Sequence, residues 1–245
     1  MQGVAYGTIP QGTPFTCGTV TRGAFVLVAF ACGGACTSFA TVRSAQVQPG
    51  PSVGAQASVS TPPGDDAAWF WSFDCASQCD HPVFGGDLGF TYGWVRPGGA
   101  PGFAFGVGTS GTHPYVDSYL QLGAGRTPFG IGMRLGPPVS NWREHQLYAR
   151  YDVPLGDRTR LLLNPAAFLH EGKSPNGDNP GTFLGFVQGV GLMLEGERIS
   201  WTPAVALVAG RAKRTSYGQQ FGPTTSVFGS ASVGVTLHRR RTTNR

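Results

Sequence analysis

The stretch Val83–Val95 (VFGGDLGFTYGWV) alternates large apolar residues with small or polar residues at every second position. Successive side chains of a β-strand point to opposite faces, so the alternation predicts a strand with one apolar face and one small, polar face. Phe84, Phe90 and Trp94 share the apolar face, whereas Asp87 lies on the opposite face. A soluble barrel packs its bulky side chains inward, and a membrane barrel turns them outward toward lipid. The pattern therefore favours a membrane barrel.

Nine further stretches show the same alternation, and most approach the roughly 9 to 11 residues that a tilted transmembrane strand requires. Bacterial single-chain barrels have an even number of strands, so ten strands fit and nine do not. We expect an all-β, up-and-down antiparallel transmembrane β-barrel of about ten strands. Eight is the alternative, in which the first stretch and one other do not cross the membrane. The expected strands are residues 69–74, 83–95, 103–108, 115–122, 129–136, 146–153, 160–170, 184–192, 199–207 and 226–237.

The connections between these stretches alternate between short and long, as they do in outer-membrane barrels with short periplasmic turns and longer outer loops. Only the connection 110–113 breaks the pattern, because it is short on the outer side. The order predicts that both termini lie in the periplasm. The short connections are 96–101, 123–127, 155–158 and 195–198, and the long ones are 75–82, 136–143, 171–181 and 212–224.

Composition agrees with a barrel and disfavours helical membrane proteins. Charged residues make up only 13% of the chain, which holds 38 glycines. A transmembrane helix needs about 18 or more consecutive apolar residues, and the chain has no such run. The net charge is +5, and residues 239–245 form a basic tail. The aromatic and basic surface of a nucleic-acid-binding module is missing, so we expect no nucleic acid and a tail that meets anionic lipid head groups.

The N-terminal region resembles a secretory signal. Arg22 precedes the short apolar run 24–31, and small residues follow, so we expect cleavage after Ala40. Cleavage after Ala31 is the alternative, and it would leave Cys32 first, as in a lipoprotein. The expected organisation is an over-long start with a signal peptide at 1–40, a disordered periplasmic lead-in at 41–66, a barrel at 67–238 and the basic tail at 239–245.

Two of the five cysteines, Cys75 and Cys79, follow the signal and lie in an expected loop. In an oxidising compartment they predict a disulfide that closes this loop. Asp80 and His81 adjoin them and make a metal site conceivable. The disulfide is favoured, because the loop is short and no second ligand cluster exists in the sequence. We therefore expect neither a metal nor a cofactor.

Eight ionisable residues fall on the inward faces of the expected strands. They either select solutes in a lumen or form ion pairs that fill it, and the narrow interior of a ten-stranded barrel favours the ion pairs. Inward glycines would leave room for larger neighbours. The expected interior charges are Asp87, Asp117, Arg134, Glu144, Arg150, Asp152, Arg160 and His170. Tryptophans near strand ends predict anchoring at the membrane interface, and these are Trp71, Trp94, Trp142 and Trp201.

The alternation, the signal and the loop pattern together resemble small outer-membrane β-barrel proteins of Gram-negative bacteria. The resemblance covers about residues 67–238 and implies outer-membrane lipid and the barrel-insertion machinery as partners. Such chains commonly end on an aromatic residue that the insertion machinery recognises. This chain departs from that pattern, because its last expected strand ends Thr236-Leu237-His238.

The stretch from Phe168 to Gly181 has a faint similarity to the lipid A deacylase family. In that family a strand histidine is followed two residues later by the nucleophilic serine, and then by an Asn-Pro-Gly turn. Here Gly172 stands two residues after His170, and no matching Glu follows on the next strand. A hydroxyl nucleophile needs its base within hydrogen-bond reach, so the similarity implies no catalytic residue.

The sequence therefore predicts an outer-membrane barrel with a structural, adhesive or narrow-pore role and no catalysis. One alternative is an outer-membrane lipid-modifying enzyme that uses His170 as its base. Another alternative is a soluble barrel that binds an apolar ligand inside.

Overall fold

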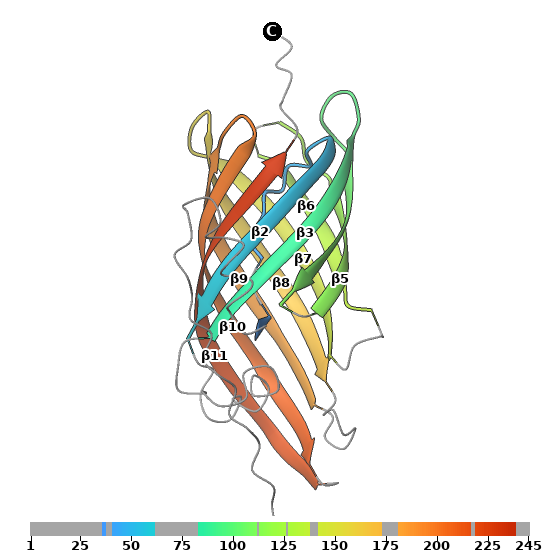
Figure 1. Cartoon of the computed structure of the whole chain (residues 1–245), viewed down its shortest axis with the longest axis vertical. Helices are drawn as coiled ribbons and strands as arrows, with labels where there is room; N and C mark the ends of the chain where they lie inside the picture. The colour runs from blue at the N-terminus through green and yellow to red at the C-terminus, as the bar shows by residue number, and fades with distance from the viewer. Residues whose placement is uncertain are drawn as a thin grey trace, which may run out of the picture.

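The computed structural model describes residues 36–37, 41–61, 83–111, 113–125, 127–137, 142–172, 181–216 and 219–238. Ten long strands form a barrel, and a two-residue strand, β1 (Cys36–Thr37), pairs in parallel with one of them (Figure 1). The ten are β2 (Gly50–Ser60), β3 (Val83–Val95), β4 (Gly102–Ser110), β5 (His113–Gln121), β6 (Phe129–Leu135), β7 (Trp142–Pro154), β8 (Thr159–Gly172), β9 (Gly181–Glu195), β10 (Ile199–Ser216) and β11 (Gln219–His238).

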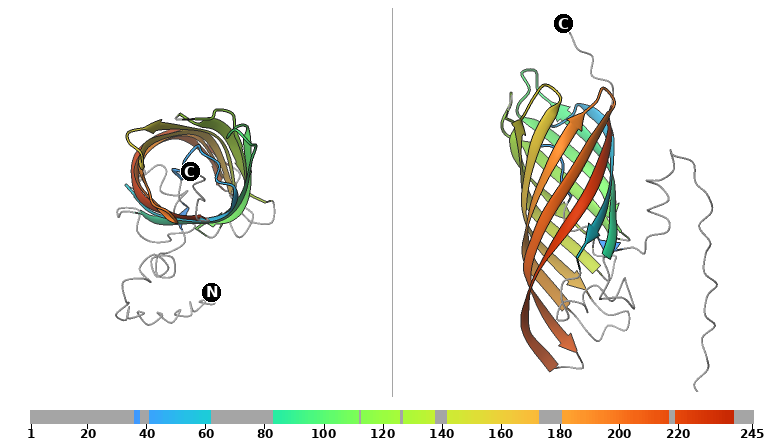
Figure 2. Two further views of the ribbon diagram at one scale, coloured as in Figure 1. Left: turned by 90° about the horizontal axis from the view of Figure 1, so that it is seen from above. Right: turned by 90° about the vertical axis from the view of Figure 1, so that its left-hand side faces the viewer.

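Each of the ten strands pairs antiparallel with the next in sequence, and β11 returns to pair with β2. The sheet therefore closes on itself without an open edge along most of its length, as the view down the axis shows (Figure 2). Closure matters because unpaired backbone groups are costly wherever water is excluded. The prediction of an all-β, up-and-down antiparallel barrel of ten strands is confirmed.

The first barrel strand is β2, which lies within the range expected to be a disordered lead-in. That expectation was wrong for residues 41–61. A period of two is in fact present in β2, where Val53, Ala55, Ala57 and Val59 alternate with Gly54, Gln56, Ser58 and Ser60. The pattern was overlooked because the apolar members are small. The strand expected at residues 69–74 lies outside the described residues.

The connections fall at two ends of the barrel. The turn end carries residues 96–101, 122–128, 155–158 and 196–198, and the loop end carries 61–82, 111–112, 136–141, 173–180 and 217–218. The prediction of a long loop at 212–224 was wrong, because β10 and β11 extend through it with 18 and 20 residues. Their hairpin projects beyond the other strands at the loop end (Figure 1).

Bulky apolar side chains cover the outside of the barrel. Phe84, Phe90 and Trp94 of β3 are 64%, 47% and 52% exposed, and eight of the other strands contribute similar residues, while Leu161, Leu163 and Leu169 of β8 are half-buried. The sheet alternates as expected, with Asp87 and Gly89 of the same strand buried inside. This arrangement is the opposite of a soluble barrel with an apolar interior.

The interior also holds an apolar cluster that the sequence reasoning did not anticipate. Phe168, Phe183, Val208 and Phe228 come from β8, β9, β10 and β11, and all are buried inside the barrel. The expectation that small and hydrophilic groups alone line the inside was therefore incomplete. Among the described residues, no helix is long and apolar enough to cross a membrane.

We predict that Phe90→Arg will destabilise the protein refolded in phospholipid vesicles by about 2–4 kcal/mol, because a cation on the outer face must leave water for lipid. Urea titration of the vesicle-bound protein measures this loss. Phe90→Leu keeps an apolar group at the same position and is the control, with a loss of about 1 kcal/mol or less. Equal losses for the two variants would contradict an outer face that contacts lipid.

Candidate functional site

A segment of the chain itself lies inside the barrel. Residues 41–49, which we call the inner segment, precede β2 and run through the lumen toward the turn end (Figure 2). Three of its side chains, Val42, Ala45 and Val47, are 4%, 0% and 6% exposed. The interior is therefore filled by main chain as well as by side chains.

Side chains of the barrel wall satisfy the backbone of the inner segment. A buried backbone amide without a partner is costly, and here polar residues of four different strands accept these bonds. Tyr119 of β5 in turn donates a hydrogen bond of 2.8 Å to the carbonyl oxygen of Ala45. The amides of Val42, Arg43, Ala45 and Val47 donate to Gln56 (3.2 Å), Asn164 (2.8 Å), Asp152 (2.7 Å) and Gln121 (2.7 Å) respectively.

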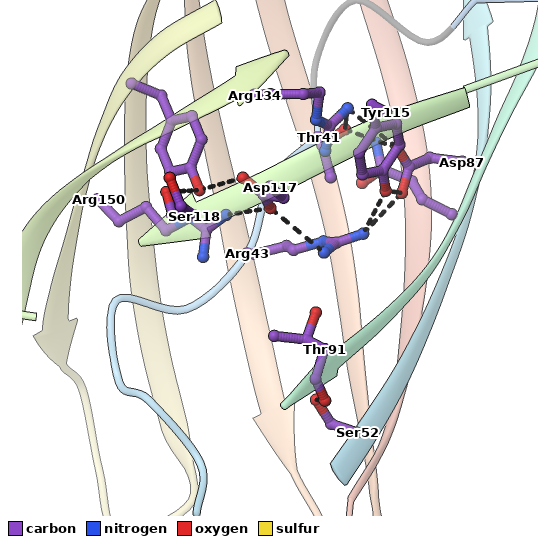
Figure 3. Close-up of polar contacts among 12 residues, drawn as sticks. Thr41, Arg43, Ser52, Asp87, Thr91, Tyr115, Asp117, Ser118, Arg134 and Arg150 are labelled. Carbon is purple, nitrogen blue, oxygen red and sulfur yellow. Dashed lines mark hydrogen bonds and ion pairs between the residues drawn. The ribbon is translucent and has the colours of Figure 1, made fainter. Parts of the chain in front are cut away.

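Arg43 is the cation of the inner segment, and two wall carboxylates face it (Figure 3). Its Nη2 lies 2.6 Å from Oδ1 of Asp87, and its Nη1 lies 3.9 Å from Oδ2 of Asp117. Asp87 also forms an ion pair with Arg134 at 3.1 Å and accepts a hydrogen bond of 3.0 Å from Tyr115. Asp87 is fully buried, so these contacts replace the water that its charge has lost.

Asp117 extends the network to the opposite wall. It lies 3.7 Å from Arg150 and accepts a hydrogen bond of 2.5 Å from Tyr148. The guanidinium group of Arg150 stacks over the rings of Tyr119 and Tyr148, with centroid distances of 4.6 and 4.5 Å. Cation–π contacts of this kind further compensate a desolvated arginine.

A third carboxylate binds the middle of the inner segment. Asp152 of β7 accepts a hydrogen bond of 2.5 Å from the hydroxyl of Ser44, in addition to the bond from the amide of Ala45. The segment is therefore attached at three acidic positions on different strands, Asp87 on β3, Asp117 on β5 and Asp152 on β7.

Inward glycines make room for the inner segment. A Cβ at Gly189 or Gly191 of β9 would come within 2.7 and 2.8 Å of the side chain of Val42. A Cβ at Gly89 of β3 would lie 3.0 Å from Nη2 of Arg43, and one at Gly93 would overlap the carbonyl oxygen of Gln48. Separations under 3.0 Å, as at Gly93, Gly189 and Gly191, are too short for real Cβ atoms, and the one at Gly89 is tight, so these glycines give the segment room against the wall.

Near the loop end, His170 of β8 is 3% exposed. Its Nε2 lies 3.9 Å from Oε1 of Glu144, and its ring packs edge-on against Phe168. Glu144 also accepts a hydrogen bond from Gln146. His170 therefore faces the filled interior and not the lipid side, and Ser174 lies outside the described residues. The geometry adds no support to the similarity with lipid A deacylases.

All eight ionisable residues expected in the interior lie there, most of them buried. Asp87, Asp117, Arg134 and Arg150 belong to one network with Arg43, Asp152 binds the inner segment, and Arg160 pairs with Glu195 at 3.7 Å. The expected set held four carboxylates and only three arginines. This imbalance was the one sign in the sequence that a further cation, Arg43, enters the barrel.

The other predicted sites have mixed outcomes. Trp94 and Trp201 are exposed on the outer face within a few residues of the turn end, and Trp142 begins β7. Trp71, the expected Cys75–Cys79 disulfide, the basic tail and nearly all of the expected signal peptide lie outside the described residues. Within that signal, β1 is described, and cleavage after Ala40 stays a prediction. No group of metal ligands occurs among the described residues.

Cavities remain in the interior among the described residues. One of about 100 Å³ adjoins Gln46, Val47 and Gln48 and reaches Glu195 and His238 at the turn end. Another, of about 20 Å³, adjoins Thr41 and Val42. The first has room for a few water molecules at most, and the second for about one.

We predict that Asp87→Asn will lower the free energy of unfolding by about 3–5 kcal/mol, because the buried guanidinium groups of Arg43 and Arg134 lose their shared counter-charge. Asp157→Asn in the exposed turn 155–158 is the matched control and should cost about 0.5 kcal/mol or less. Denaturant titration in the same detergent compares them. A loss at Asp87 no larger than that at Asp157 would show that the network contributes little.

No protein-family model and no curated protein match the chain. Among solved structures, it is similar to Neisserial surface protein A (NspA), with 10% identity and a TM-score of 0.37 over 76% of this chain and 96% of that one. It is also similar to the β domain of the Bordetella autotransporter BrkA, with 12% identity and a TM-score of 0.35 over 78% and 99%. Likenesses this distant carry no inference, and the strand pairing of the chain itself establishes its fold.

Proposed function

We propose that the protein is an integral outer-membrane β-barrel of a Gram-negative bacterium, closed at rest by its own inner segment. The observation that carries this proposal is the inverted distribution of side chains. Bulky apolar residues are exposed on nine of the ten strands, while Asp87 inside the barrel is paired with Arg43 and Arg134. Charged residues of membrane-spanning segments are tolerated where they face the interior and have partners.

The residues that border the apolar outer face at its two ends support the placement in a membrane. Near the turn end the outer face carries aromatic residues, including Tyr92 and Trp94 of β3, Tyr151 of β7 and Trp201 of β10. Aromatic residues of this kind concentrate at membrane interfaces. Near the loop end the outer face turns polar, where Lys213, Thr182, Glu171 and Arg143 lie side by side on β10, β9, β8 and β7.

The two ends then have different surroundings. Short turns face the periplasm and longer loops face outward in outer-membrane barrels, which assigns the turn end and both ends of the barrel sequence to the periplasm. The β10–β11 hairpin, with exposed Arg211 and Lys213 near its tip, would stand beyond the outer leaflet. A structural or adhesive role at the cell surface is consistent with that projection.

The filled interior supports a barrel that does not conduct at rest. The inner segment and the side chains that bind it occupy the lumen, and the described cavities beside it measure about 100 and 20 Å³. A narrow-pore role would therefore require the contents of the lumen to move.

We predict that the full-length protein will require detergent for extraction from membranes and will migrate differently on gels with and without heating, because a closed barrel resists denaturation by detergent at low temperature. In planar bilayers the same preparation should show no steady conductance. A protein that stays in solution without detergent and shows no heat-dependent shift would contradict the membrane placement. A steady conductance would contradict the closed resting state.

A further inference from the structure

The inner segment is attached to the barrel without belonging to its sheet. Residues 41–49 form no strand, and their backbone amides donate to wall side chains such as Gln56, Asp152 and Gln121. The ten strands, in contrast, are paired with one another around the ring. Departure of the segment would therefore break side-chain contacts and leave every backbone ladder of the barrel intact.

The junction between the inner segment and the wall is suited to a change of direction. Gly50, the first residue of β2, has a φ of +84°, a conformation that residues other than glycine rarely adopt. A Cβ built at Gly50 would meet nothing within 4 Å, so the junction is uncrowded. The cavity of about 100 Å³ lies beside Gln46, Val47 and Gln48, which means that the wall does not enclose this half of the segment on every side.

We propose that the inner segment is a displaceable plug and that its departure opens a cation-conducting path through the barrel. This inference rests on the proposed placement in the outer membrane. It adds an activity, the gated passage of small cations, to a barrel that is otherwise sealed.

The charges that would remain determine the selectivity. Without Arg43, the wall residues of the network and its surroundings include five carboxylates and three guanidinium groups, with His170 beside Glu144, so acidic groups outnumber guanidinium groups in the opened lumen. The carboxylates are Asp87, Asp117, Glu144, Asp152 and Glu195, and the guanidinium groups are Arg134, Arg150 and Arg160.

Glycines of the wall provide the space that the inner segment occupies and would leave. Gly93 on β3, with Gly189 and Gly191 on β9, face the segment at distances too short for an added Cβ, and Gly89 on β3 faces it closely. Without the segment, these glycines would line a gap of the segment's own width. Val47 of the segment belongs to the apolar cluster that holds Phe168, Phe183 and Phe228, and Val42 to a second cluster, so its departure would also separate these apolar contacts.

The test compares single-channel currents of the full-length protein and Arg43→Ala in planar bilayers. Arg43→Ala removes the ion pair with Asp87, while Asp87 keeps Arg134 as a partner. We expect the open probability to rise about 10- to 100-fold, and the reversal potential in a potassium chloride gradient to show preference for the cation. Arg158→Ala, in an exposed turn outside the barrel interior, is the matched control and should stay closed.

A disulfide between the inner segment and the wall, which we call the lock, distinguishes movement of the plug from a general destabilisation of the barrel. A Cβ at Gly102 would lie 3.2 Å from the Cβ of Val47, close to the roughly 3.5–4.5 Å found across disulfides. The lock combines Val47→Cys and Gly102→Cys with Arg43→Ala, in a background whose native cysteines are replaced by serine. Oxidation should abolish the currents, and reduction should restore them.

The heat-dependent gel shift shows whether Arg43→Ala is folded. The inference is overturned if the folded variant stays closed, if its currents prefer anions, or if the currents persist unchanged in the oxidised disulfide variant. Arg43→Gln, which keeps much of the side chain's volume, replaces Arg43→Ala if the latter does not fold, and the same outcomes apply to it. Failure of the full-length protein to insert or to show a heat-dependent shift would instead overturn the proposed membrane placement.

Discussion

The pairing of Asp87 with Arg43 and Arg134 is the interaction on which the interior of this barrel depends. Asp87 lies on the wall and is fully buried, and it accepts contacts from the inner segment and from β6 at once. An isolated charge in such a place would be very costly, whereas a paired and hydrogen-bonded charge is tolerated. One carboxylate thus joins two parts of the chain that no backbone ladder connects.

The same requirement explains why the inside and outside differ so strongly. Because the outer face carries bulky groups such as Phe84 and Trp94, the inner positions of the same strands are left to small and polar residues. In β3 these positions are taken by glycines as well as by Asp87, and the glycines admit the inner segment. Exterior composition and interior filling are therefore two consequences of one alternating sequence.

Much of the fold was predictable because bulky apolar residues recur at every second position along most of the strands. Val83–Val95 was predicted with the bounds that β3 has. β2 was missed because its apolar residues are mostly alanine and valine, whose contrast with serine and glycine is weak. The extension of β10 and β11 through 212–224 was missed because glycine, proline and polar residues there suggested a loop, whereas pairing within the hairpin outweighs that local preference.

The residues that face the interior were predictable for the same reason, since successive side chains of a strand point to opposite faces. Their partners were not, because contacts such as Arg43 with Asp87 join residues that are 44 positions apart. The inner segment has no period at all, so no local pattern indicates that it lies in the lumen. Only the excess of inward carboxylates and glycines on the wall pointed to a missing occupant, and neither identifies which part of the chain supplies it.

The most direct measurement of this account is amide hydrogen exchange of residues 41–49 in the protein refolded into lipid nanodiscs, followed by mass spectrometry. The amides of Ala45 and Val47 donate to Asp152 and Gln121 inside the barrel, so their exchange should be slowed at least about 100-fold relative to an unstructured peptide. Exchange of these amides at the rate of an unstructured peptide would contradict a barrel that is filled by its own chain.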